Sequence, residues 1–208
     1  MRKGVYVPMI ALCLLLTACG GPGDGEADAA SLRDAYHDMT GCTMEAAVTC
    51  VREDQVWTAE LRCGYVPDGD TTVEVLSPEP IAGVRAVLHG DSWDLEYEDL
   101  CLDVGTLSSQ ELSPMACLPR LMDALRDGWL LEENKEEWEG TPCLRLTVDQ
   151  SGIRDGKILS TLWLRLEDGT PLRGEVAVED EIILTAEFTA FSFYDMMEGQ
   201  EESGSAAP

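Results

Sequence analysis

Basic residues are scarce in this chain, which has 14 Lys and Arg against 40 Asp and Glu and a formal net charge of −26. A surface of this sign repels polyanions, so we expect no nucleic-acid partner. Histidine is also rare: His37 and His89 are the two in the sequence, and neither lies in an H-E-x-x-H or paired-histidine motif. The residues typical of a metal hydrolase are therefore missing, and we expect no metal and no cofactor.

Long hydrophobic runs are lacking as well. The N-terminal apolar run, residues 5–18, is shorter than the roughly 20 residues that a membrane-spanning helix needs. Basic residues at positions 2–3 precede it, as in a secretory signal peptide, and LTAC (16–19) ends it. This ending resembles the lipobox of bacterial lipoproteins. The resemblance implies removal of residues 1–18 and lipidation of Cys19, which would anchor the protein on the extracytoplasmic face of the cell membrane.

Breaks in composition divide the rest of the chain. Residues 19–30, rich in Gly and acidic residues, are expected to form a flexible tether, and residues 198–208 a disordered acidic tail. Between them, residues 31–197 are long enough for one domain with a substantial core, and 45% hydrophobic residues argue against disorder. We expect this domain to be a monomer.

No C-x-x-C pair occurs, which argues against zinc ribbons and thioredoxin-type motifs. Loss of Cys13 with the signal and lipidation of Cys19 leave six cysteines, an even number that is compatible with disulfides in an exported protein. Five of the six lie in segments of apolar periodicity, as buried free cysteines do, so we favour mostly reduced core cysteines.

One pairing can be tested from geometry. Cys42 and Cys50 share one face of the predicted strand CTMEAAVTC. Eight steps of about 3.3 Å separate their Cα atoms by roughly 26 Å, whereas a disulfide tolerates at most about 7 Å. We therefore predict that these two cysteines do not pair with each other.

Alternation of apolar and polar residues dominates the chain and predicts strands. It is clearest in WTAELRCGY (57–65) and TLWLRLED (161–168), and it continues in VEV, CLRLTVD, GEVAVED and ILTAEFTAF. Turn signals separate these segments, at Pro67-Asp68-Gly69, Asp155-Gly156 and Asp168-Gly169. The pattern predicts a large antiparallel meander with one apolar face.

Two segments have helical spacing instead. In SLRDAYHDM, Ser31 is the predicted N-cap. In LSPMACLPRLMDALRDG, Ser113 is the predicted N-cap, Pro114 the first helical residue and Gly128 the C-cap. Pro119 should kink this second helix or split it. Its apolar stripe consists of Leu118, Leu121, Met122 and Leu125.

The order of these elements, a helix, strands, a central Ser-Pro helix and returning strands, resembles the LolA/LolB lipoprotein-carrier superfamily. The segments that carry the resemblance are PEPIAGVRA (78–86), LSPMACLPRLMDAL (112–125), LWLRLEDGTPLRGEV (162–176) and FTAFSF (188–193). It implies an α+β fold in which a large antiparallel sheet forms an unclosed half-barrel, with two or three helices covering its concave apolar face.

The resemblance also implies a ligand, an acyl chain, lipid or partner lipoprotein held in the half-barrel. The residues expected to contact it are Trp57, Leu61, Leu118, Met122, Leu162, Leu164, Leu166, Val176, Val178 and Phe188. The carrier LolA is not lipidated, whereas this chain has a lipobox. A LolB-like receptor, or a signalling lipoprotein such as those of spore germination, is therefore the closer analogue.

An enzymatic interpretation finds little support. Gly90-Asp91-Ser92 is similar to the nucleophile block of GDSL-type hydrolases, and DAYH (34–37) to their D-x-x-H motif. In that family the two motifs occur in the opposite order, on a parallel sheet. We interpret HGDS (89–92) as a hairpin turn, and the acidic runs EENKEEWE (132–139) and VEDE (178–181) as solvated faces. We expect no catalytic residues.

Two functions are thus compatible with the sequence. The first is an anchored lipoprotein that holds an acyl chain, lipid or partner lipoprotein in its cavity. The alternative is an anchored protein–protein interaction module of an envelope complex whose cavity is filled by its own side chains. Cavity volume distinguishes the two, because a ligand carrier needs an apolar pocket on the order of 300–1,000 Å³.

Overall fold

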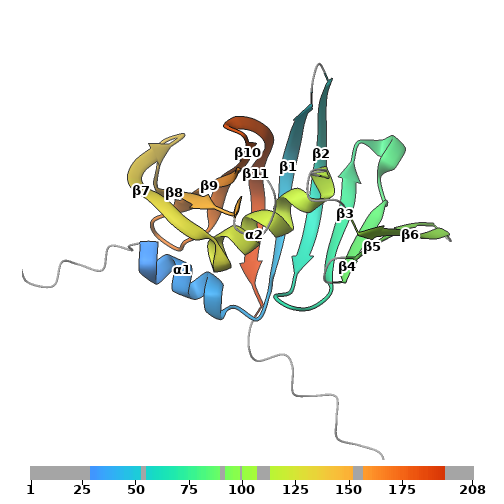
Figure 1. Cartoon of the computed structure of the whole chain (residues 1–208), viewed down its shortest axis with the longest axis horizontal. Helices are drawn as coiled ribbons and strands as arrows, with labels where there is room; N and C mark the ends of the chain where they lie inside the picture. Colours follow the sequence, from blue (N-terminus) through green and yellow to red (C-terminus); the bar gives the residue numbers. More distant parts are fainter. Residues whose placement is uncertain are drawn as a thin grey trace, which may run out of the picture.

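The computed structural model describes residues 29–194 except 53–54, 90–91, 99, 107–112 and 152–156. Within these ranges, eleven antiparallel strands form one sheet that does not close, together with two α-helices and two short 3₁₀ helices (Figure 1). The elements in chain order are α1 (Ala29–Asp38), β1 (Cys42–Arg52), β2 (Gln55–Tyr65), β3 (Thr71–Ser77), η1 (Glu79–Ile81), β4 (Arg85–His89), β5 (Ser92–Tyr97), β6 (Leu100–Thr106), η2 (Pro114–Ala116), α2 (Cys117–Asp127), β7 (Trp129–Trp138), β8 (Thr141–Asp149), β9 (Ile158–Arg165), β10 (Pro171–Val178) and β11 (Glu181–Phe193). The predicted α+β half-barrel is confirmed.

The sheet consists of two meanders rather than one. Its strand order is β6-β5-β4-β3-β2-β1-β11-β10-β9-β8-β7, so the first and last strands of the chain pair in the middle of the sheet. The β1–β11 register runs from Cys42 opposite Phe193 to Cys50 opposite Leu184. The segment containing α2 connects β6 and β7, which are the two edges. A single continuous meander, as the sequence suggested, would not have joined its ends in this way.

Alternation along each strand divides the sheet into an apolar and a polar face, as predicted. On β2, Ala59, Leu61 and Cys63 are buried, whereas Glu60 and Arg62 between them are exposed. The β1–β2 hairpin is tight, with Arg52 opposite Gln55. The buried face of every central strand contributes to one hydrophobic core.

The interpretation of HGDS as a hairpin turn is also confirmed. β4 and β5 pair antiparallel with His89 opposite Ser92, and the two residues between them lie outside the described residues. The Ser92 hydroxyl donates a hydrogen bond to the His89 carbonyl at 3.0 Å. The Ser92 hydroxyl therefore stabilises the hairpin in which it lies.

The central helix begins and divides as its sequence predicts. The Ser113 hydroxyl accepts a hydrogen bond from the Met115 N–H at 3.3 Å and caps the short helix η2. The α-helix α2 then starts at Cys117, which places Pro119 in its first turn, where a missing N–H removes no hydrogen bond within the helix. Gly128 is the C-cap, with φ −70° rather than a left-handed conformation.

The first helix differs from its prediction. α1 already includes Ala29, so Ser31 lies inside the helix and is not its N-cap, and residues 29–30, assigned to the tether, are helical. The signal peptide, Cys19, the rest of the tether, the Asp155-Gly156 turn and the C-terminal tail lie outside the described residues. Neither helix in the described ranges is long and apolar enough to cross a membrane.

None of the six cysteines that the structure describes forms a disulfide bond. Cys42, Cys63, Cys117 and Cys143 are buried, Cys50 is half-buried and Cys101 is exposed. Cys42 and Cys50 lie near opposite ends of β1, which confirms the strand on which their predicted non-pairing depends. The expectation of reduced core cysteines therefore agrees with this structure.

Thiol reactivity should follow this burial. Burial raises the pKa of the Cys42 and Cys117 thiols to about 12, so neither forms the reactive thiolate at neutral pH. We expect Cys101 to react quickly with a thiol reagent in the native protein, and the buried cysteines only after denaturant is added. Peptide mapping of the labelled protein checks this, and fast native labelling of Cys42 would contradict the packing described here.

Candidate functional site

All ten residues predicted to contact a ligand meet in the hydrophobic core. Leu61, Leu118, Met122, Leu162, Leu164 and Val176 have 0% exposed surface. Trp57, Leu166, Val178 and Phe188 are partly buried and pack against the same core. The structure thus brings the ten residues together in one core, and their role in binding a ligand stays a prediction.

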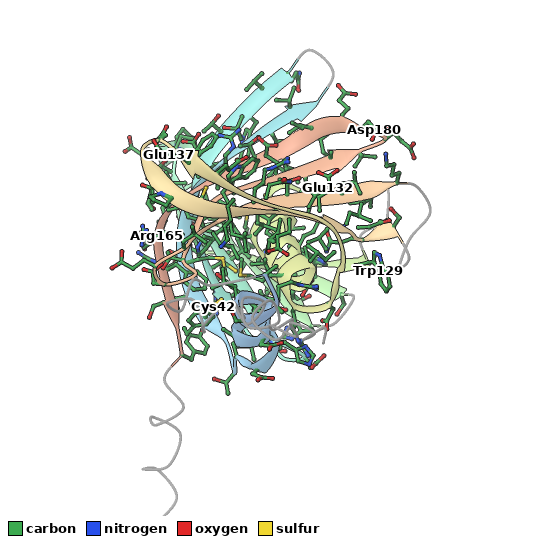
Figure 2. All side chains as sticks on the ribbon, turned by 90° about the vertical axis from the view of Figure 1, so that its left-hand side faces the viewer. Cys42, Trp129, Glu132, Glu137, Arg165 and Asp180 are labelled. Carbon is green, nitrogen blue, oxygen red and sulfur yellow. The ribbon has the colours of Figure 1, made fainter. Side chains whose placement is uncertain are left out.

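The helix α2 occupies the concave face on which these residues lie. The sheet curves around it (Figure 2). A Cβ atom added at Gly174 on β10 would lie 2.4 Å from Cδ1 of Leu121, and one added at Gly128 would lie 2.1 Å from Cγ1 of Val148. Both distances are far below van der Waals contact, so the helix rests directly on the sheet at these two glycines.

Hydrogen bonds hold α2 to the sheet at both sides. The Tyr65 hydroxyl on β2 donates to Oδ1 of Asp123 at 2.6 Å. At the other side, Nε2 of Gln150 donates to the Arg120 carbonyl at 3.1 Å, and the buried Ser160 hydroxyl donates to Oε1 of Gln150 at 2.7 Å. Buried polar groups with partners on both elements fix one position of the helix.

The end of α2 is fixed by α1. Nε of Arg33 donates to the Leu125 carbonyl at 3.0 Å, and Nη2 donates to the Gly128 carbonyl at 2.6 Å. A guanidinium group at this end satisfies carbonyl groups that have no partner inside the helix and complements its negative dipole. α1 thus anchors α2 rather than forming a second lid over an open space.

This packing decides what the concave face can do. A cavity wide enough for even a water molecule leaves accessible surface on the side chains that line it. Six of the ten predicted ligand contacts have none. In this conformation the protein's own side chains fill the space around these six residues, and a ligand could reach them only if α2 moved away.

The sheet continues beyond α2, toward its β6 edge (Figure 1). A cross-strand row runs from Val73 through Ala86 and Leu95 to Leu102, each directly opposite the next. Val73 and Ala86 are fully buried, Leu95 is half-buried and Leu102 is 62% exposed. The apolar face of the sheet that forms the core is therefore exposed to solvent at the β6 edge.

Three side chains make up this exposed surface, which we call the β6 apolar patch: Tyr97, Leu100 and Leu102. They are 40%, 66% and 62% exposed, and Tyr97 lies opposite Leu100. Sequence reasoning missed this patch because β6 was not recognised as a strand. The only signal was the short apolar alternation at its start.

A pocket of about 420 Å³ lies between α1, the end of α2 and the start of β7. Its lining residues are Ala29, Ala30, Arg33, Asp34, His37, Arg126, Leu130 and Glu133. Arg33 is engaged by α2 as described above, and Nη2 of Arg126 pairs with Asp68 at 2.9 Å. This mixed, charged lining does not suit an acyl chain.

No three His, Cys, Asp or Glu side chains of the described ranges are grouped so that they could hold a metal ion. A titratable surface contact joins the hairpin described above to Asp70, which directly precedes β3. Nδ1 of His89 lies 2.7 Å from Oδ1 of Asp70, and Nε2 lies 3.7 Å from Oδ2 of Asp94. The hydrogen bond to Asp70 raises the pKa of His89 above its ordinary value of 6.5.

A pH titration tests this pair. Because the pKa of His89 is raised, its contribution to stability is fully present below the unfolded pKa of about 6.5 and is lost as the pH rises through the folded value. We expect NMR titration of the imidazole to give a pKa above 6.5 that falls in Asp70→Asn. An unchanged His89 pKa in the variant would exclude the pair.

No family model and no curated protein matches the sequence. Among solved structures, a LolA superfamily protein from Nitrosomonas europaea is similar with a TM-score of 0.46 and 11% identity, over 82% of this chain and 95% of that one. The lipoprotein LppX from Mycobacterium tuberculosis has a TM-score of 0.41 and 13% identity, over 78% and 95%. The complex of the CwlD amidase with the GerS lipoprotein from Clostridioides difficile has a TM-score of 0.39 and 14% identity, over 81% and 92%. The superfamily that the sequence motifs resemble is thus among the similar structures.

Proposed function

We propose that this chain is an extracytoplasmic lipoprotein, anchored through a lipid on Cys19, whose domain binds a protein partner at its surface rather than a lipid in a cavity. The observation that supports this choice is the filled concave face, where α2 leaves six of the ten predicted ligand contacts without accessible surface. Of the two functions compatible with the sequence, the filled core favours the interaction module.

The β6 apolar patch is the surface proposed to bind the partner. Exposed aromatic and leucine side chains that adjoin a core are typical of protein interaction sites. The patch lies at the opposite edge of the sheet from β7, so a partner can approach it without displacing α1 or α2. The lipid anchor would confine this encounter to the membrane surface.

Photo-crosslinking in the producing cells tests the proposal. A photoreactive amino acid at Leu102 of the full, anchored chain should give a discrete crosslinked protein species. The same amino acid at Glu60, which is exposed on the polar face of β2, should not. Introducing Leu100→Asp should weaken the Leu102 crosslink, because a carboxylate in the patch opposes burial.

Two results would count against the proposal. One is a set of crosslinks that is the same from Leu102 and Glu60, or absent from both in a folded protein. The other is saturable, micromolar binding of a fluorescent fatty acid, which would favour the lipid carrier and require α2 to leave the concave face. Mapping the bound fatty acid to residues such as Leu162 would then identify the cavity.

A further inference from the structure

The two edges of the sheet differ in how they are protected. Edge strands expose unpaired N–H and C=O groups, and proteins commonly block them with charged side chains. Nearly every side chain of β7 is exposed, and five of its ten residues are charged, as Glu132 and Glu137 illustrate along the strand in Figure 2. The β7 edge is thus protected against pairing with another strand.

The described side chains of the β6 edge lack this protection. The first three residues, Leu100, Cys101 and Leu102, are exposed, so both faces of this part of the strand present uncharged side chains. The described strands place β5 on one side of β6 and none on the other. An exposed apolar edge strand is a template for an added strand from another chain.

Charge around this edge has one sign. Residues 92–106, which include β5 and β6, contain five acidic residues and no Lys or Arg. Glu96 lies opposite Cys101 on the polar face, and Glu98 is exposed in the turn between the strands. A strand that joins this edge would therefore meet an apolar surface on its concave side and carboxylates on its polar side.

We infer that the β6 edge accepts an extended segment of a partner protein as an added strand, with apolar side chains beside the β6 apolar patch and basic side chains beside Glu96 and Glu98. This inference rests on the proposed function and names the chemistry of the partner. A second copy of the chain fits less well, because it would bring the same carboxylates and a formal charge of −26 to the same edge.

Designed peptides test the inference on the full chain carrying Cys19→Ala. An eight-residue peptide of alternating Val and Lys is compared with its Val/Glu counterpart and with a Val/Lys peptide N-methylated along one edge. We expect the Val/Lys peptide to bind and to shift the amide NMR signals of residues 92–102. Its affinity should fall in high salt. The Val/Glu and N-methylated peptides should bind at least about tenfold more weakly, because they lose the charge match or the hydrogen bonds.

Variants locate the binding edge. Leu102→Asp should reduce Val/Lys binding, whereas Leu131→Asp on β7, where the side chain is 48% exposed, should leave it unchanged. Equal binding of the N-methylated peptide, no binding of any peptide at millimolar concentration, or self-association of the chain through β6 would overturn the inference. If crosslinks from Leu102 persist while the peptides fail, the partner docks on the patch without adding a strand, and the proposed function stands.

Discussion

Replacing Leu121 by alanine is expected to lower the free energy of unfolding by about 2–5 kcal/mol. The side chain has 0% exposed surface and packs between α2 and the sheet, so its removal leaves a cavity in the core. Urea denaturation measures the change. Leu131→Ala on the exposed edge strand β7 is the matched control and should change stability by less than about 0.5 kcal/mol.

A double-mutant cycle tests the contact itself. Gly174→Ala introduces a Cβ that would lie 2.4 Å from Cδ1 of Leu121, and overpacking of this kind costs about 1–3 kcal/mol. In the Leu121→Ala background the space is open, so the same change should cost much less. Strictly additive effects of the two substitutions would mean that α2 does not rest on the sheet at Gly174.

The second large effect is expected at the N-terminus, where Cys19→Ala should abolish lipidation and release the protein from the membrane. Several acyl chains on one residue give a stable anchor, because each buried CH₂ contributes about 0.8 kcal/mol. Labelling with radioactive palmitate and cell fractionation measure the loss. The described domain begins at Ala29, so its circular dichroism spectrum should not change.

Cys13→Ala is the control for this experiment. Cys13 lies within the apolar part of the signal and outside the LTAC motif, so the variant should still be lipidated. Incorporation of palmitate into the Cys19→Ala protein would show that the lipobox interpretation is wrong. Release from the membrane in both variants would instead indicate a failure of export.

The fold was predictable where one face of a strand is buried. β2 and β9 alternate because their apolar residues enter the core, and the same alternation is readable in the sequence. β7 lacks it: both of its faces are solvated, so its acidic run was correctly interpreted as solvated but not as a strand. The pairing of β1 with β11 joins residues 134 to 151 positions apart, from Cys50 with Leu184 to Cys42 with Phe193, and a local pattern contains no information about it.

The candidate site was predictable in part for a related reason. Apolar periodicity identifies residues such as Leu118 and Leu162 that face the concave side, but it is the same whether a ligand or the protein itself fills that side. The small size of Gly174, which lets α2 approach, has meaning only once the opposite residue is known. The sequence does not indicate that Leu100 and Leu102 are exposed, because their exposure depends on their place at the edge of the sheet.

Native mass spectrometry of the Cys19→Ala chain, purified from the cells that produce it, tests the central claim most directly. This variant has no lipid of its own, so any lipid mass must come from a bound ligand. Because α2 fills the concave face, we predict the mass of the bare polypeptide and no lipid in an organic extract. One lipid bound to most of the molecules would contradict the account and restore the carrier function.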